Sequence, residues 1–376
     1  MKHNWTKLLL SFAVSSILFS SCKPDPDTDT PIADKYTPSV FIGSQNQFLY
    51  AINPTTGIKK WESYIGADIK ASPVLQNNIL FVAASNTLFK LDPNTGKQQR
   101  STVSFPSDIS TTPVANDSMI FVASGASLKC VNIGKDIAKW TFTTGAAINS
   151  SPMLIDTQLI FGCDDGFVYM LDHRTGNQIW KAGPFGTLFF SSPTADTALV
   201  YIGAEDGKLY ALKRKDGTNG WTTGPKQTGA KIRSSPLVYG GTVFFGSDDN
   251  KLYAIQTIDG ATVWTMTTAD RVRSSPYLQG QTIYVGSYDQ GFYAVNVLDG
   301  SIKWTVKTGG LIASSPVCYN GRVYFGSYDR NFYAVDEAKG TTTWKYAVNG
   351  LIDCSPSVDV NNGKGINSTI SGNSTY

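Results

Sequence analysis

The 376-residue chain is predicted to be an all-β protein, an eight-bladed β-propeller built from four-stranded antiparallel blades. Three observations predict this fold: a repeat of about forty residues, eight copies of a Ser-Pro or Thr-Pro pair, and short apolar strands separated by turn-forming residues. Such a period with four strands per unit is typical of propeller blades. The 35 glycines and the low charged fraction of 16% suit a compact sheet protein with many turns.

Each repeat is marked by a tryptophan with a glycine four residues before it. The tryptophans are Trp61, Trp140, Trp180, Trp221, Trp264, Trp304 and Trp344. The second unit has Arg100 in place of the tryptophan, and the third has Asp136 in place of the glycine. Runs such as 252–255 and 282–285 contain β-branched and aromatic residues and are almost continuously apolar, which predicts strands buried on both faces, as in blades packed between two neighbours.

The order of the repeat elements predicts how the ring closes. The repeat prolines are Pro73, Pro113, Pro152, Pro193, Pro236, Pro276, Pro316 and Pro356. The chain enters the first unit after its Ser-Pro strand and carries an extra such strand at residues 354–356. We expect that C-terminal strand to pair into the first blade, because closure removes exposed strand edges. A seven-bladed or open arrangement is the alternative.

The N-terminus resembles a bacterial lipoprotein signal. A short basic region precedes an apolar run at 8–19, which is too short for a membrane span and suits a signal peptide. The sequence Phe-Ser-Ser-Cys that ends at Cys22 resembles a lipobox, which predicts a signal peptide at 1–21 and a lipid on the Cys22 thiol. An ordinary signal peptide with an incidental cysteine is the alternative.

Residues 22–38 are predicted to be a tether, because proline and aspartate alternate there with nothing apolar to bury. The propeller would then occupy residues 39–376. Acidic residues directly after the lipidated cysteine also resemble surface-export signals of Bacteroidetes lipoproteins. The expected location is therefore the outer membrane or the cell surface, with the leaflet left open.

The pattern Tyr-x-x-Asp-x-x-Thr-Gly-x-x-x-Trp at 169–180 resembles the PQQ-like repeat propellers, and the resemblance covers nearly the whole mature chain. This family includes the propeller of PQQ-dependent dehydrogenases and the propeller lipoprotein of the outer-membrane barrel-assembly machinery. In the family, each tryptophan docks onto the backbone near the glycine of an adjacent blade. The resemblance implies that structural role for the seven tryptophans above.

Residues suited to catalysis are scarce. Of the two histidines, His3 leaves with the signal, and His173 is expected in a solvated turn, so a multi-histidine metal site is excluded. The chain has no Cys-x-x-Cys-His haem motif and none of the adjacent cysteines of PQQ-dependent dehydrogenases. We therefore expect no catalytic residue, no metal and no cofactor, with PQQ and calcium as the alternative. The small net charge of +3 does not indicate the clustered basic surface that binds nucleic acid.

Two recurrent residue types have structural interpretations. Cys130, Cys163, Cys318 and Cys354 replace small strand residues and are predicted to be buried thiols. A disulfide is the alternative, for which Cys318 and Cys354 on consecutive inner strands form the better pair. Aspartates recur in one register after Gly-Ser or its variants, which predicts turn capping rather than ion binding; these are Asp165, Asp206, Asp249, Asp289 and Asp329.

The best functional candidates are positions where the repeat varies. The residue three before each repeat proline differs between units: Lys70, Ser110, Asn149, Phe190, Arg233, Arg273, Ala313 and Asp353. The family topology places the Ser-Pro strand innermost, so these side chains would surround the mouth of a central channel. The candidate binding residues are Lys70, Asn149, Phe190, Lys231, Arg233, Arg271, Arg273 and Asp353. Their cations predict a basic side of the mouth that binds an acidic or carbohydrate ligand or a partner's loop, and a solvated rim is the alternative.

The expected function is a non-catalytic, membrane-anchored binding scaffold for protein–protein interaction in the cell envelope, similar to outer-membrane protein assembly. The alternatives are a quinoprotein-type oxidoreductase and a carbohydrate-binding surface protein that uses the channel mouth. The expected partners are envelope proteins or glycans, with the membrane reached through the lipid anchor. We expect a monomer and no nucleic-acid partner.

Overall fold

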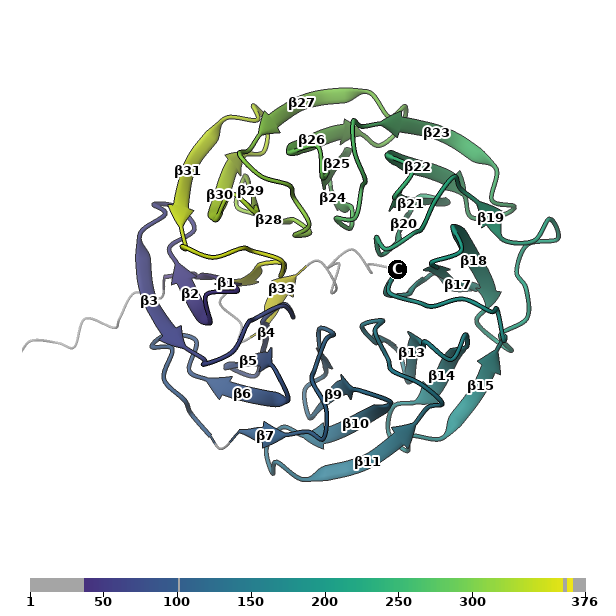
Figure 1. Ribbon diagram of the computed structural model, residues 1–376, viewed down its shortest axis with the longest axis horizontal. Helices are drawn as coiled ribbons and strands as arrows, with labels where there is room; N and C mark the ends of the chain where they lie inside the picture. Colours follow the sequence, from purple (N-terminus) through teal and green to yellow (C-terminus); the bar gives the residue numbers. More distant parts are fainter. Residues whose placement is uncertain (1–36, 101, 361–363, 368–376) are drawn as a thin grey trace, which may run out of the picture. The chain divides into compact units, whose positions relative to one another are not determined.

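The computed structural model describes residues 37–100, 102–360 and 364–367, which form eight antiparallel sheets arranged as the blades of a ring (Figure 1). The chain divides into residues 1–36 and 37–376, and the second unit is the propeller. The predicted signal peptide, Cys22 and nearly all of the tether lie outside the described residues. In the described part, no helix has the length and apolar character needed to cross a membrane.

The eight-bladed, all-β prediction is confirmed. Each blade runs from an innermost strand at the channel to an outer strand at the rim. The innermost strands are β4 (Val74–Gln76), β8 (Val114–Ala115), β12 (Met153–Ile155), β16 (Thr194–Ala195), β20 (Leu237–Tyr239), β24 (Tyr277–Gln279), β28 (Val317–Tyr319) and β32 (Ser357–Asp359). The second strands are β1 (Val40–Gly43), β5 (Ile79–Ala84), β9 (Met119–Ser124), β13 (Gln158–Gly162), β17 (Leu199–Gly203), β21 (Thr242–Ser247), β25 (Thr282–Gly286) and β29 (Arg322–Gly326).

The two outer positions complete each blade. The third strands are β2 (Phe48–Ile52), β6 (Thr87–Leu91), β10 (Ser127–Asn132), β14 (Val168–Asp172), β18 (Lys208–Lys213), β22 (Lys251–Gln256), β26 (Gly291–Asn296) and β30 (Asn331–Asp336). The outer strands are β3 (Lys59–Tyr64), β7 (Val103–Ser104), β11 (Ala138–Thr143), β15 (Gln178–Ala182), β19 (Lys226–Gln227), β23 (Thr262–Thr267), β27 (Ile302–Lys307) and β31 (Thr342–Ala347). We number the blades 1 to 8 in the chain order of these outer strands.

Burial follows the position of a strand in its blade. Second strands such as β5 are buried along their whole length, because both faces pack against neighbouring blades. Outer strands such as β31 instead alternate between exposed and partly buried residues. The hydrophobic core therefore lies between the blades.

The predicted ring closure is also confirmed. Strand β32 pairs antiparallel with β1, with Val358 opposite Val40 and Ser357 opposite Phe41. Blade 1 thus joins the two ends of the described chain. Blade 1 also carries an additional strand, because β33 (Gly365–Asn367) pairs with β32 on its inner side (Figure 1).

Tryptophans link consecutive blades at the rim. Each indole Nε1 donates to a backbone carbonyl of the next blade; the acceptors of Trp61, Trp140, Trp180, Trp221, Trp264, Trp304 and Trp344 are Pro93, His173, Arg214, Thr257, Val297, Glu337 and Pro54. The indole also lies against a glycine of that blade. A Cβ atom on Gly300, whose φ is +73°, would lie 2.6 Å from the Trp264 ring, so only glycine fits under the indole.

The junction between blades 2 and 3 is built differently. Arg100, which stands in the tryptophan position, donates from Nη1 to the carbonyl of Gly134 at 2.9 Å. Beneath it, the ammonium of Lys90 pairs with the carboxylate of Asp136, which occupies the glycine position with φ +58°. The Lys90 side chain is fully buried. Hydrogen bonds and an ion pair thus replace the stack of an indole on a glycine.

Candidate functional site

The central channel opens at a mouth formed by the segments that lead into the innermost strands. A buried apolar side chain lies four residues before each repeat proline. At six of the eight positions it packs against the glycine at the end of the second strand of the preceding blade, as Ile312 does against Gly286. This contact fixes the next residue at the mouth. The mouth leads into a cavity of about 270 Å³, and Lys70, Ser110, Asn149, Phe190, Ala313 and Asp353 are among its lining residues.

Arg233 and Arg273 do not line this cavity, because carboxylates hold them. Arg233 donates from Nε and Nη2 to the two oxygens of Glu205 at 2.6 and 2.9 Å, and Lys231 donates to the same carboxylate at 2.8 Å. Arg273 binds both oxygens of Asp248 at 2.8 and 2.7 Å. The expected basic side of the mouth is therefore largely charge-neutralised, a correction to the sequence-based expectation.

The electrostatics of these pairs follow from the same contacts. Burial alone would raise the pKa of Glu205, but the hydrogen bonds from Arg233 and Lys231 hold it below its ordinary value. The Arg273 guanidinium has a raised pKa because it donates to Asp248. Bidentate pairs of this kind fix the side-chain geometry as well as the charge.

Asp353 and Asn149 at the mouth are also linked to neighbours. Asp353 accepts hydrogen bonds from the Tyr328 hydroxyl on one oxygen and from the Gln45 amide on the other. Asn149 accepts from Ser110 at 3.0 Å and donates to Asp164 at 2.7 Å. Burial raises the pKa of Asp164. The mouth is thus a set of preorganised polar contacts and not a freely solvated rim.

The other candidates differ in their surroundings. Lys70 is exposed, lines the cavity and has no hydrogen bond or ion pair with any described residue. Arg271 is half exposed and lies 3.7 Å from the Asp270 carboxylate, outside the cavity lining. Phe190 is 37% exposed, and its ring centroid lies 5.1 Å from the Arg233 guanidinium.

Sequence reasoning missed Glu205 and Asp248, the carboxylates that pair with the two arginines. Both directly follow the small residues that end a second strand, one position before a recurrent aspartate. That position varies between repeats, as the mouth position does. A comparison of the two variable positions along the repeats could have found the pairs, because both have a similar separation in sequence. Glu205 and Arg233 are 28 residues apart, and Asp248 and Arg273 are 25 residues apart.

Hydroxyl side chains form a ring inside the cavity, which we call the hydroxyl belt. Its members directly precede the repeat prolines: Ser72, Thr112, Ser151, Ser192, Ser235, Ser275, Ser315 and Ser355. Seven hydroxyl oxygens of this ring participate in one pattern, in which each accepts the backbone N–H of the preceding belt residue at 2.9–3.1 Å. The belt ties the innermost strands together around the axis.

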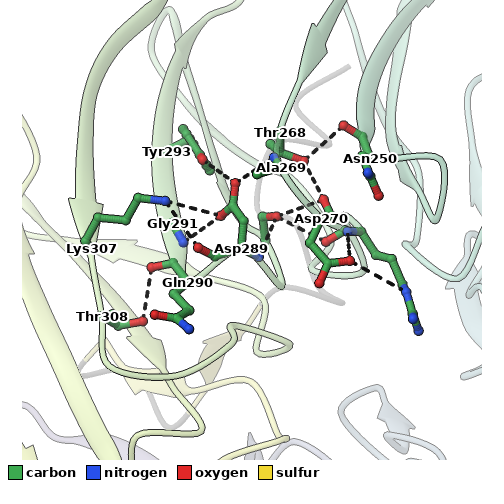
Figure 2. Close-up of polar contacts among 12 residues, drawn as sticks. Asn250, Thr268, Ala269, Asp270, Asp289, Gln290, Gly291, Tyr293, Lys307 and Thr308 are labelled. Carbon is green, nitrogen blue, oxygen red and sulfur yellow. Dashed lines mark hydrogen bonds and ion pairs between the residues drawn. The ribbon is translucent and has the colours of Figure 1, made fainter.

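The recurrent aspartates form turn contacts, as Figure 2 shows for Asp289. Its carboxylate accepts the Tyr293 hydroxyl at 2.6 Å, the Gly291 N–H at 2.7 Å and the Ala269 N–H at 3.0 Å. Burial would raise the pKa of Asp289, but these hydrogen bonds lower it below its ordinary value. Asp289 therefore connects its own hairpin to the loop that enters the blade.

The described cysteines are four buried free thiols, so the structure contains no Cys318–Cys354 disulfide. Cys354 accepts the Gly43 N–H at 3.2 Å, the contact that Ser314 makes with Gly326 in the preceding blade. Burial raises the pKa of the Cys354 thiol to about 12.

His173, expected in solvent, is partly buried and meets the Phe121 ring edge-on at 5.9 Å.

The described channel does not fit calcium-bound PQQ. Calcium takes six to eight oxygen ligands, mostly carboxylates and carbonyls. The cavity lining has one carboxylate, Asp353, whose two oxygens already accept hydrogen bonds. Within residues 37–100, 102–360 and 364–367, no group of three or more His, Cys, Asp or Glu side chains is arranged to hold a metal ion.

Fold and channel together define a class, the eight-bladed propellers of PQQ-like repeats. Residues 45–187, 184–274 and 259–360 match the model of the family described as outer membrane protein assembly factor BamB. These matches cover most of the sequence, so the chain belongs to this family. No curated protein sequence matches the chain.

Solved structures share the fold at low sequence identity. The computationally designed Ika8 protein matches with a TM-score of 0.70 and 14% identity, over 79% of this chain and 95% of the designed one. BamB from Moraxella catarrhalis matches with a TM-score of 0.65 and 18% identity, over 76% of this chain and 90% of that protein. A europium-containing methanol dehydrogenase matches with a TM-score of 0.65 and 12% identity, over 78% and 82%. At these identities the likeness is one of fold alone.

Proposed function

We propose that the protein is a non-catalytic binding scaffold of the cell envelope, attached to the outer membrane through a lipid on Cys22 and engaged in protein–protein interaction related to outer-membrane protein assembly. Membership in a family described as an outer-membrane assembly factor supports this proposal. The lipobox-like sequence that ends at Cys22 supports the anchor. A ring held by inter-blade contacts offers a partner a rigid surface, which lowers the entropic cost of binding.

One surface carries the proposal. Leu188 and Phe190, which are 41% and 37% exposed, lie in the segment that enters blade 5 at the mouth. The guanidinium of Arg233 lies over the Phe190 ring and is itself fixed by Glu205. Aromatic and arginine side chains dominate the binding energy of many protein interfaces, especially where their geometry is set in advance. We call Leu188, Phe190 and Arg233 the mouth patch.

The chemistry of the mouth patch defines the partner segment. Leu188 and Phe190 favour an apolar side chain, and the guanidinium edge of Arg233 favours a carbonyl or carboxylate oxygen. The partner is therefore an envelope protein that presents a loop with an apolar residue beside an acceptor group.

The test uses the full lipidated chain in native envelope membranes, with a photo-crosslinking amino acid at position 190. We expect a discrete adduct with one envelope protein. The matched control carries the same amino acid at Ile258, which is 79% exposed in the turn between β22 and β23. No adduct at position 190, or the same adducts at both positions, would refute the proposal.

A double substitution, Phe190→Ala with Arg233→Ala, should weaken binding to the crosslinked partner about thirty-fold, the effect of losing a two-kcal/mol hot spot. Glu205 would keep its ion pair with Lys231, so the fold should survive. The affinity would be measured by surface plasmon resonance with the purified partner, and unchanged affinity would remove the mouth patch from the interface.

A further inference from the structure

The hydroxyl belt is interrupted at one place, between Ser151 in blade 4 and Ser192 in blade 5. At the seven other junctions, a backbone N–H reaches the hydroxyl of the next blade. Among the described residues, the Ser151 N–H has no acceptor, and the Ser192 hydroxyl has no donor or acceptor. Both residues are partly exposed and line the cavity. We call this interruption the belt gap.

A buried hydroxyl next to the belt gap also lacks a partner. Ser150, which directly precedes Ser151, is fully buried, and its hydroxyl has no hydrogen-bond partner. In the next blade, the equivalent Ser191 hydroxyl donates to the Ser234 carbonyl at 3.0 Å. The equivalent hydroxyls of Thr111 and Ser274 also lack partners among the described residues, although the belt is continuous at their junctions, so the belt gap is the feature particular to blades 4 and 5. Polar groups away from bulk water are rarely left without partners.

The lining presents a ring of donor groups. A belt hydroxyl that accepts an N–H still has its own O–H to donate, and no described residue accepts from any of the eight. The Ser151 N–H adds a ninth donor at the belt gap. The side-chain acceptors of Asp353 and Asn149 at the lining already receive hydrogen bonds, Asp353 from Tyr328 and Gln45 and Asn149 from Ser110.

The charge at the cavity lining favours a negatively charged ligand that accepts hydrogen bonds. Lys70 at the cavity lining has no ion-pair partner among the described residues. Asp353 accepts hydrogen bonds from Tyr328 and Gln45. Asp164, which lies outside the cavity lining, accepts one from Asn149, and its other oxygen is buried without a partner. Hydrogen bonds from hydroxyl and amide donors are strongest when the acceptor is ionised.

We propose that the belt gap binds an oxoanion group, a carboxylate or a phosphate, through the Ser151 N–H and the hydroxyls of Ser151 and Ser192. The ligand enters through the mouth and takes the place of the missing inter-blade contact. This site lies inside the channel and does not depend on the mouth patch as a protein interface, so either proposal can fail without the other.

The test follows the backbone amide resonance of Ser151 by NMR in the full mature chain. Sodium phosphate and sodium acetate are added in separate titrations at constant ionic strength. We expect a saturable downfield shift of the Ser151 amide proton with at least one anion, and the responding anion identifies the source as phosphate or carboxylate. The absence of a saturable shift with both anions overturns the proposal.

The Ser192→Ala variant should weaken binding of the responding anion about tenfold, the loss expected for one hydrogen bond to a charged group. No described N–H donates to the Ser192 hydroxyl, so this substitution leaves no amide newly unpaired. The Ser192→Thr variant should keep the affinity, since a threonine already serves in the belt at position 112. Equal binding by the wild type and Ser192→Ala overturns the proposal.

The matched control is Ser315→Ala, the same substitution in the belt at blade 8. It should leave anion affinity unchanged within twofold, and a loss equal to that of Ser192→Ala would overturn the assignment to the belt gap. Hydrogen exchange of the wild type gives a second measurement. The Ser151 amide should exchange faster than the hydrogen-bonded Ser235 and Ser275 amides and become protected by the anion. Exchange of Ser151 that stays unaffected by either anion would contradict binding at this amide.

Discussion

At the scale of single residues, the junction between blades 2 and 3 shows that the loss of the repeat tryptophan is accompanied by changes at the positions that an indole would contact. In blade 1, Ala51 pairs with Trp61 across the β2–β3 ladder, and the indole covers Gly96 of the next blade. In blade 2, the position equivalent to Ala51 holds Lys90, whose ammonium reaches Asp136 in blade 3. The long lysine side chain occupies space that an indole would need, and a carboxylate replaces the glycine that an indole would cover.

The buried ammonium makes this junction sensitive to loss of its partner. Asp136→Asn should lower the free energy of unfolding by about 3–5 kcal/mol, because it leaves the fully buried Lys90 without a counter-charge. Asparagine tolerates the positive φ of this position, so the effect reports charge and not backbone strain. Urea unfolding followed by tryptophan fluorescence measures the change.

The matched variant is Lys90→Met, which removes the buried charge and keeps most of the side-chain volume. It should cost less than Asp136→Asn, since the Asp136 side chain remains 23% exposed to water. A larger loss for Lys90→Met than for Asp136→Asn would contradict this account of the junction.

At the scale of structural elements, the aspartate turns join strands that are distant in sequence. Asp289 receives N–H groups from its own β25–β26 hairpin and from the loop after β23, and Asp329 repeats the arrangement with Gly309 and Asn331 one blade later. In each case a tyrosine hydroxyl completes the site. Four-stranded blades thus acquire a common polar anchor at one end of their second and third strands.

These turns predict acid sensitivity. The folded protein holds the pKa of Asp289 below its ordinary value, so the carboxylate stabilises the fold above the unfolded pKa, near 4, and that contribution disappears as the pH falls through the folded pKa. Asp289→Asn should therefore flatten the pH dependence of the unfolding free energy between about pH 2 and pH 5. Urea unfolding across this pH range measures it.

Asp299→Asn serves as the control. Hydrogen bonds from Ser301 also lower the pKa of Asp299, but this carboxylate lies in an exposed turn, where solvent screens its contribution to stability. Its pH profile should change less than that of Asp289→Asn. The same flattening in both variants would mean that the turn geometry of Asp289 has no special effect.

At the scale of the whole molecule, closure depends on β32. This strand supplies the innermost position of blade 1, and the belt continues through Ser355 to Ser72 at 3.1 Å. Strand β33 adds to the inner edge of β32, and a Cβ atom on Gly365 would lie 2.9 Å from Leu75 of β4. Strand β32 alone therefore closes the ring, and β33 covers the inner edge of β32.

Two truncations separate these roles. A chain that ends at residue 360 keeps β32 and should retain a cooperative thermal transition and a monomeric elution volume. A chain that ends at residue 350 lacks β32 and leaves the edge of β1 unpaired, so it should unfold at a much lower temperature or aggregate. Calorimetry and size-exclusion chromatography provide the comparison, and equal behaviour of the two truncations would contradict a closing role for β32.

Local patterns were sufficient to predict the blades, because each blade is a short-range unit of about forty residues. The spacing of the tryptophans and of the Ser-Pro pairs predicted eight blades, and the extra copy at residues 354–356 predicted how they close. The second-strand runs were predictable for a similar reason, since burial on both faces leaves a nearly continuous apolar sequence. Strand β33 carries no repeat signature, and the sequence offered no sign of it.

The mouth residues were also predictable as positions, but their chemistry was not. Arg233 and Arg273 indicated a basic surface until the fold brought Glu205 and Asp248 against them from other strands. Asp353 meets Gln45 across 308 residues, a contact that only ring closure creates. The net charge of a surface can be stated only when the spatial neighbours of each charged side chain are known.

The sequence by itself therefore determined the repeat, the number of blades, the closing strand and the ring of variable positions around the channel, because all of these depend on periodic local signals. Only the tertiary structure decided which of those positions are neutralised, how Lys90 and Asp136 replace the missing tryptophan contact, and where the hydroxyl belt is interrupted. These features depend on which groups face one another across strands and blades that are distant in sequence. No repeat pattern encodes such pairs, because they form only when the ring has packed.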